Sequence, residues 1–175
     1  MSSQTITLGG GCFWCTEGAL TGLKGVNRVT PGYSGGYLKN PTYEQVCSKK
    51  TGHAEVVKVS FDPDIISLKK LLMVFFTSHD PTQLNRQGND IGPQYRSIIL
   101  FKNLEQKEEI KLVIENILTL YKNKIVTEVV ELKEFYEAEK HHHDYYSKNS
   151  YQPYCAMVVA PKIKKVRKKF AHLYD

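Results

Sequence analysis

Two cysteines stand three positions apart in the stretch GGGCFWC, residues 9–15, near the start of the chain. Good helix formers with apolar spacing predict a helix over 13–23, which places Cys12 at the first free N–H groups of that helix. Those donors and the helix dipole stabilise a thiolate. The preceding glycines are expected to let the backbone approach a ligand closely. Cys12 is therefore the best candidate for a nucleophile, and Glu17, one turn on, is expected to serve the dipole of its own helix.

The C-x-x-C spacing is open to other interpretations. A structural zinc site needs four ligands, but Cys47 and Cys155 are isolated, and the contiguous histidines His141–His143 cannot all face one ion from regular structure. No metal is therefore expected, and the histidine run is interpreted as helix surface. No Gly-Lys-Ser/Thr follows the glycines, so a P-loop is excluded. A thiol–disulfide exchange protein remains open, although Phe13 and Trp14 between the cysteines must either stack on an apolar substrate or pack as core.

Glu55 is the best candidate for an acid. It lies in the segment AEVVKVSF (54–61), whose alternation predicts a half-buried strand, and it is in phase with Val57 and Val59. A carboxyl on the core face of a strand is partly desolvated, which raises its pKa and equips it as a general acid. The alternative is a glutamate at a strand edge that points to water.

Two long connections are predicted, over residues 34–53 and 79–94. Long structureless connections inside a compact domain are usually functional. The first carries several tyrosines, including Tyr43, and the second is dense in polar groups, including Asp90, and leads to Tyr95. We expect these connections to bring binding groups to a rigid sheet.

The chain has 175 residues, of which 41% are hydrophobic, and this suits one domain over residues 1–175. No stretch approaches the roughly 18 apolar residues of a membrane span, and the start lacks the regions of a secretory signal, so a cytoplasmic protein without membrane contact is expected. Six basic residues lie in 162–170, and the rest of the chain balances the net charge of +6 to zero. The apolar spacing there predicts a helix with a solvated basic face. A basic nucleic-acid binder is the non-enzymatic alternative, but no nucleic acid is expected as a partner.

Alternating and helical periodicities predict the elements of the fold. Ser67 and Asn103 are predicted helix N-caps, with Gln106 in the capping-box position. The predicted strands are 4–8, a strand from 26, 54–61, 95–101 and 126–132, and the predicted helices are 13–23, 67–79, 103–124 and 162–173. This order predicts an α+β fold, a ferredoxin-like split βαβ two-layer sandwich with long functional loops and a C-terminal helix.

Five motifs follow one another along the chain: GCFWC, NPTYEQVCS, TGHAEVVKVSFDP, HDPTQLNRQGNDIGPQYRSII and KEFYEAEKHHHDYYSKN. In this order the sequence closely resembles the A-type peptide methionine sulfoxide reductases, from about residue 6 to the C-terminal helix. The resemblance implies an enzyme that reduces the S epimer of methionine sulfoxide, free or in oxidised proteins. It also implies a chain without a bound cofactor, recycled by thioredoxin, or by dithiothreitol in vitro. A monomer is expected.

The same resemblance implies roles for individual residues. Cys12 attacks the sulfoxide sulfur, Phe13 and Trp14 line a pocket for the S-methyl group, and Glu55 protonates the sulfoxide oxygen. Sulfoxide oxygen is a poor leaving group until it is protonated, so the chemistry needs such an acid. Three further side chains are implied to hold that oxygen or to order the site: the phenols of Tyr43 and Tyr95 and the carboxylate of Asp90.

Attack should leave a sulfenic acid on Cys12, which condenses with a second thiol to a disulfide. Cys15 is favoured as this resolving thiol, because it lies one helical turn away and reaches Cys12 if the first turn frays. Cys155 is the alternative, since the family often uses C-terminal cysteines. However, the stretch after Cys155 is expected to be an ordered strand and helix and not a mobile tail. Cys47 matches a structural cysteine of the family, and His142 best matches its single histidine in this region.

Overall fold

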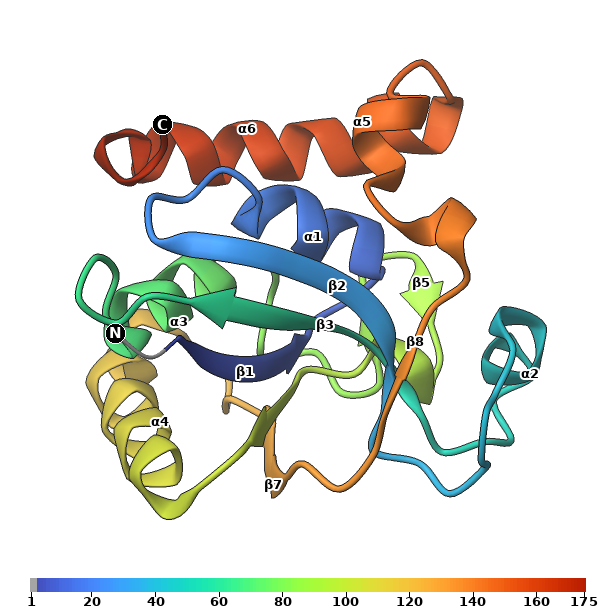
Figure 1. Cartoon of the computed structure of the whole chain (residues 1–175), viewed down its shortest axis with the longest axis horizontal. Coiled ribbons are helices and arrows are strands. Elements are labelled where there is room, and N and C mark those ends of the chain that lie inside the picture. The colour runs from blue at the N-terminus through green and yellow to red at the C-terminus, as the bar shows by residue number, and fades with distance from the viewer. Residues whose placement is uncertain (1–2) are drawn as a thin grey trace.

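A curved sheet surrounded by helices forms the body of the computed structural model, which describes residues 3–175 (Figure 1). The strands are β1 (Gln4–Gly9), β2 (Val26–Ser34), β3 (Ala54–Phe61), β4 (Arg86–Gln87), β5 (Asp90–Ile91), β6 (Ile98–Phe101), β7 (Glu128–Glu131) and β8 (Phe135–Glu137). The α-helices are α1 (Phe13–Leu20), α2 (Tyr43–Cys47), α3 (Leu68–Thr77), α4 (Leu104–Ile117), α5 (Tyr145–Asn149) and α6 (Ala160–Lys169). Shorter turns of 3₁₀-helix are η1 (Pro93–Tyr95), η2 (Leu118–Leu120), η3 (Lys140–His142) and η5 (Ala171–Leu173), and η4 (Cys155–Val159) is a π-helix.

Six strands form the main sheet in the order β7-β6-β1-β3-β2-β8. Strand β3 runs antiparallel to both β1 and β2, β6 runs antiparallel to β1, and β8 runs antiparallel to β2. Strand β7 pairs in parallel with β6. The expected mixed α+β fold is confirmed, and β3 at the centre of the sheet carries the candidate acid Glu55.

The main core lies on one face of this sheet. Leu8 of β1 pairs with Val57 of β3, and both side chains are fully buried together with Val59, as the alternation predicts. Helices α1, α3 and α4 contribute to the same core, and α6 packs on the outer side of α1 (Figure 1). A small second cluster around Val56 and Ile98 lies on the other face of the sheet. Site residues at the ends of β1 and β3 are therefore anchored in the most buried part of the chain.

The predicted N-caps of α3 and α4 are confirmed. Ser67 accepts a hydrogen bond from the N–H of Lys70 (3.2 Å), and Asn103 accepts one from the N–H of Gln106 (2.9 Å). Each such cap contributes about 1 kcal/mol. The side chain of Gln106 does not complete a capping box, because its Oε1 accepts from the N–H of Lys102 (2.8 Å) and not from that of Asn103. Its amide donates to the carbonyl oxygen of Thr5 (2.8 Å) and thereby joins α4 to β1.

The two long connections contain more regular structure than predicted. The first holds α2, which begins with a capping box between Thr42 and Gln45. The second holds the β4–β5 hairpin and η1, so the strand predicted from residue 95 begins only at Ile98. Elements of two to five residues are too short to show a periodicity and are stabilised by their tertiary contacts.

The C-terminal third differs most from the prediction. Strand β8 and helix α5 were not predicted, and the strand expected after Cys155 is wrong, because η4 runs directly into α6. Val158 and Val159 favour a strand locally, but packing against α1 determines the helical conformation. Ile163 and Val166 are buried under α6 and its other side is exposed and basic, as predicted. Within residues 3–175, no helix is long and apolar enough to cross a membrane.

Candidate active site

The glycines before Cys12 are packed against other parts of the protein. A Cβ atom on Gly10 would lie 2.6 Å from the ring of His79. Gly11 has a φ of +84°, a conformation that favours glycine, and its N–H donates to the carbonyl oxygen of Tyr95 (3.1 Å). The expectation that these glycines admit a ligand is therefore wrong. They allow neighbouring segments to approach the backbone before Cys12.

Cys12 immediately precedes α1 and is buried. Burial raises the pKa of its thiol well above the ordinary value, and the negative charge of Glu55 raises this pKa further. The backbone N–H of Trp14 acts in the opposite direction, as expected at a helix start. Burial outweighs that donor, so the expectation of a stabilised thiolate is wrong for the free protein, in which Cys12 is a thiol.

Glu55 has the environment predicted from its phase. Only 1% of the residue is exposed, and its Oε1 accepts a hydrogen bond from the N–H of Phe13 (3.1 Å). Its Oε2 is buried and has no hydrogen-bond partner among residues 3–175. Burial raises the pKa of Glu55 to about 8, and the charge of Asp90 adds to this increase. At neutral pH the carboxyl group is therefore mostly protonated, with one oxygen held by the backbone and the other without a partner in the described part of the chain.

The two long connections place three predicted residues around Glu55. Tyr43 is the first residue of α2, and Tyr95 is the last residue of η1. Burial raises the pKa of both phenols, with the charge of Glu55 as the next largest cause, so both remain O–H donors at neutral pH. Asp90 begins β5 and accepts a hydrogen bond from the phenol of Tyr154 (2.6 Å).

Phe13 and Trp14 belong to an aromatic cluster. The ring of Phe13 is fully buried, with its centroid 6.3 Å from that of Tyr43. Trp14 is half-buried and stacks on Tyr145 at 3.8 Å with an interplanar angle of 6°. His142 lies among these rings, with its centroid 4.4 Å from that of Tyr43. The aromatic cluster of these five residues adjoins the Glu55 carboxyl through the backbone of Phe13.

The position of His142 corrects the surface interpretation of the histidine run. Only 3% of His142 is exposed, and its Nδ1 accepts a hydrogen bond from the indole N–H of Trp14 (3.2 Å). Burial lowers the pKa of His142 to about 4, so the ring is neutral at neutral pH and carries its proton on Nε2. Because η3 is a 3₁₀ turn, the side chains of the three consecutive histidines point in different directions. His141 is exposed, as predicted.

Glu139 holds the start of α2 and was not found from the sequence. Its carboxylate accepts hydrogen bonds from the phenol of Tyr33 (2.8 Å) and from the N–H of Tyr43 (3.0 Å). Burial acts to raise the pKa of Glu139, but these hydrogen bonds outweigh it and lower the pKa below its ordinary value. Glu139 is therefore an ionised anchor for the backbone of Tyr43.

Glu17 serves a different helix from the one predicted. Its buried carboxylate accepts hydrogen bonds from the N–H groups of Asp144 (2.9 Å) and Tyr145 (3.3 Å), at the start of α5. Burial raises the pKa of Glu17 to about 7. The contact joins α1 to α5 and thereby holds Tyr145 against Trp14.

The four cysteines are free thiols. Cys15 is buried one turn below Cys12, and its N–H donates to the carbonyl oxygen of Cys12 (3.1 Å). Burial raises the pKa of Cys15 to about 11, while the positive charge of Lys162 acts to lower it. Cys155 is fully buried in η4, and the negative charge of its thiolate form raises the pKa of Cys15. Cys47 is partly exposed beside Tyr43.

The site residues that sequence reasoning missed lie mostly between residues 138 and 159. Glu139, Tyr145 and Tyr154 belong to short turns and helices in that segment, where no periodicity marks a buried side. The available signal was the density of tyrosine and histidine in KHHHDYYSKNSYQPY, residues 140–154. Such a density of amphipathic rings in polar sequence is typical of a binding surface.

Residues 4–174 match the family described as peptide methionine sulfoxide reductase. A relative named peptide methionine sulfoxide reductase MsrA, from Saccharolobus solfataricus, is 54% identical over 167 residues, which are 95% of this chain and 94% of the relative. The structure of Mxr1 from Saccharomyces cerevisiae in reduced form has a TM-score of 0.83 at 35% identity and covers 87% of this chain and 89% of Mxr1. Mxr1 in complex with Trx2 has a TM-score of 0.59 at 26% identity, with 82% of this chain and 84% of Mxr1 covered. The chain belongs to the peptide methionine sulfoxide reductase family.

Proposed function

We propose that this chain reduces methionine sulfoxide to methionine, with Cys12 as the nucleophile and Glu55 as the proton donor. The observation that carries the proposal is the buried carboxyl of Glu55, which is protonated at neutral pH and has an unpartnered Oε2. Its electrostatic effect on the buried Cys12 thiol supports the closeness of the two groups. The names of the relatives supply the substrate class.

In the proposed reductive step, one oxygen atom moves from the substrate sulfur to the sulfur of Cys12. The sulfur of Cys12 attacks the sulfoxide sulfur and forms an S–S bond, while Glu55 transfers its proton to the sulfoxide oxygen. The proton lost by the thiol restores the Glu55 carboxyl. The protonated oxygen then moves to the sulfur of Cys12 as the substrate S–O bond and the S–S bond break, which releases the reduced substrate and leaves a sulfenic acid on the oxidised cysteine.

The remaining predicted residues have proposed roles in binding. Tyr43 and Tyr95 donate hydrogen bonds to the sulfoxide oxygen, which their protonated phenols beside Glu55 support. Phe13 and Trp14 contact the S-methyl group, and their place in the aromatic cluster supports this role. Asp90 orders the site through its hydrogen bond with Tyr154. We infer from the family resemblance that the S epimer is the substrate, free or in oxidised proteins.

Cys15 is the proposed resolving thiol. Its position one turn from Cys12 supports this role, and the charge of Cys15 acts directly on the pKa of Cys12. Cys155, the alternative thiol, lies further along the chain in η4 and raises the pKa of Cys15. The Cys15 thiol displaces water from the sulfenic acid and forms a disulfide. A dithiol reductant then regenerates both thiols, and the complex of yeast Mxr1 with Trx2 supports a thioredoxin in that role.

Turnover with dithiothreitol and each epimer of free methionine sulfoxide tests this function. The chain should consume the S epimer, and the Cys12→Ser variant should consume neither. Cys47→Ser is the matched control, because it removes a thiol without a proposed role, and it should retain activity. Reduction of scrambled disulfides without loss of the S epimer would instead identify a thiol–disulfide exchange protein and contradict the proposal.

We further propose that the four strands β6-β1-β3-β2 form a ferredoxin-like split βαβ unit. Their order and antiparallel pairing support this classification, as β1 and β2 run in the same direction on either side of β3. Strands β7 and β8 then extend the unit at its two edges. This arrangement places the end of β1, and hence Cys12, beside Glu55 at the start of β3.

A further inference from the structure

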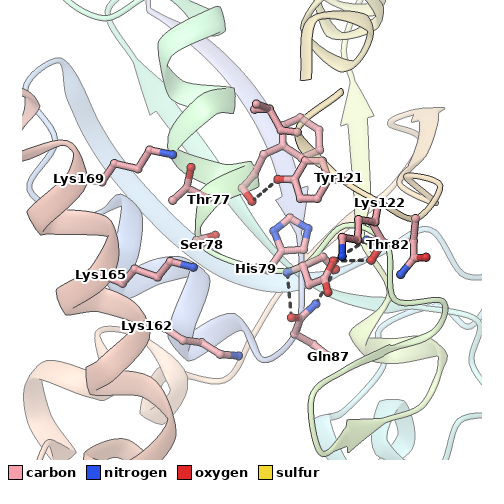
Figure 2. Close-up of a pocket in the computed structure, with 14 residues that line it drawn as sticks. Thr77, Ser78, His79, Thr82, Gln87, Tyr121, Lys122, Lys162, Lys165 and Lys169 are labelled. Atoms are coloured by element: carbon pink, nitrogen blue, oxygen red, sulfur yellow. Dashed lines mark hydrogen bonds between the residues drawn. The ribbon is translucent and has the colours of Figure 1, made fainter. Parts of the chain in front are cut away.

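A cleft of about 640 Å³ lies between three segments of the chain, behind the glycines that precede Cys12, which pack against two of its lining residues, His79 and Gln87. Its walls are the C-terminal end of α3 with residues 77–80, the segment 120–123 after α4, and one side of α6 (Figure 2). Cys12, Glu55 and the rings of the aromatic cluster do not line this cleft. A ligand bound here would therefore not occupy the proposed reaction site itself, although Lys162 on its wall acts on the pKa of Cys15.

One wall of the cleft is a row of three lysines. Lys162, Lys165 and Lys169 stand at positions i, i+3 and i+7 of α6, so they share one side of the helix over about 10 Å. Figure 2 shows the three side chains extending from α6 toward the end of α3 and His79. Burial of Ile163 and Val166 beneath α6 fixes the direction of this row.

The protein neutralises only part of the positive charge of the cleft. Lys122 adds a fourth ammonium group from the opposite wall. Asp80 is the only acid in the lining, and its carboxylate already accepts hydrogen bonds from the N–H (3.0 Å) and hydroxyl (2.6 Å) of Thr82 and from the amide of Gln83 (3.4 Å). Within residues 3–175, none of the four lysines takes part in an ion pair.

The floor of the cleft is rigid. Gln87 accepts from the N–H of Asp80 (2.9 Å) and donates to its carbonyl oxygen (3.0 Å), and His79 is held between Phe75 and Ser97 at 2.9 and 2.8 Å. The floor therefore has its polar groups satisfied, and the lysines supply the free donors. The carbonyl end of α3 contributes at most about half a negative charge, which leaves a clear positive excess.

We propose that this lysine cleft, lined by Lys122, Lys162, Lys165 and Lys169, binds a compact anion that carries several phosphate groups. A concave site lined by one sign of charge concentrates the field and attracts anions. Its volume is within the range of small-molecule sites. No arginine is among the residues that line the cleft, and arginine is the side chain whose planar guanidinium group best matches a carboxylate. The lining therefore favours phosphate over carboxylate groups. A short row of point charges suits a chain of phosphates, supplied by a nucleotide or by inorganic polyphosphate.

Titration calorimetry of the full chain with inorganic tripolyphosphate tests the proposal. The double variant Lys165→Gln/Lys169→Gln should bind at least about tenfold more weakly, because two ammonium groups are lost from the row. The matched control is Lys164→Gln/Lys168→Gln, which removes the same charge from the other side of α6 and should change affinity less than about twofold. Equal weakening in both variants, or no saturable binding to the unaltered chain, would overturn the proposal.

Competing ligands distinguish the chemistry of the occupant. Adenosine triphosphate should displace tripolyphosphate, and tighter binding of one of the two identifies a nucleotide or an inorganic chain as the source of the phosphates. Single phosphate should bind far more weakly, since it contacts fewer lysines. Tighter binding of a tetraglutamate peptide or of a single-stranded oligonucleotide than of tripolyphosphate would contradict the assignment to a compact phosphate anion.

Discussion

At the scale of single residues, the two oxygens of Glu55 have different surroundings, and the proposed chemistry depends on the unpartnered one. Glu55→Gln retains an acceptor for the N–H of Phe13 but removes the transferable proton. We expect single-turnover reduction of the S epimer to slow by about 10²-fold or more. Alkylation of Cys12 by iodoacetamide should not slow, because Glu55 is already mostly uncharged at neutral pH and the amide leaves the charge beside this thiol unchanged.

Glu131→Gln, at an exposed position of β7, is the matched control for that variant and should leave both rates unchanged. Equal loss of alkylation and reduction in Glu55→Gln would mean that the variant disturbs the thiol or the fold, and the assignment of Glu55 as proton donor would then fail.

The choice between the two candidate resolving cysteines is also a question about single residues. In a Cys15→Ser variant, one equivalent of substrate should be reduced, after which a sulfenic acid persists on Cys12 and thioredoxin no longer supports turnover. Cys155→Ser should turn over like the unaltered chain. Peptide mass spectrometry after one turnover without reductant should show a disulfide between Cys12 and Cys15 within one peptide. A crosslink from Cys12 to Cys155 would identify the alternative thiol.

At the scale of elements, α2 depends on an anchor outside itself. The five-residue helix carries Tyr43, and Glu139 holds its first N–H. Glu139→Gln weakens a charge-assisted hydrogen bond at this helix start, so Tyr43 should occupy its position less often. We expect kcat for the S epimer to fall about tenfold, with alkylation of Cys12 unchanged. Glu137→Gln is the matched control, because this exposed neighbour pairs only with His143 within residues 3–175. Equal loss in both variants would contradict a positioning role for Glu139.

The elements that could be predicted from sequence are those whose signals are local. Helices α3 and α4 have caps and an apolar side within one segment, and the phase of Glu55 follows from the strand that contains it. The burial of His142 instead depends on Trp14, 128 residues away in the chain, and no local pattern encodes it. Strand β8 is also encoded by distant contacts, since its three residues form a strand only by pairing with β2.

At the scale of the whole molecule, four buried groups determine how stability depends on pH around neutrality. Glu17 and Glu55 have pKa values raised to about 7 and about 8, so the folded chain holds protons that the unfolded chain loses above about pH 4.5. Their contribution to stability is lost as pH rises toward 8. His79 and His142 have pKa values lowered to about 4, so their contribution is lost as pH falls below about 6.5.

These two opposing pairs leave a pH window in which the effect of the glutamates outweighs that of the histidines. Above about pH 6.5 each unfolded histidine loses only its remaining, roughly half, proton, which offsets a small part of the glutamate effect, so the free energy of unfolding should still fall by about 2 kcal/mol between about pH 6.5 and 8. Urea unfolding with reduced thiols measures this slope. Glu55→Gln should remove the larger share of it, because Glu55 has the higher pKa of the two glutamates. Glu109→Gln, at an exposed position of α4, should leave the slope unchanged. A stability that stays constant or rises across this window would show that Glu17 and Glu55 are ionised in the folded chain, and the carboxyl of Glu55 could then not be the proton donor at neutral pH.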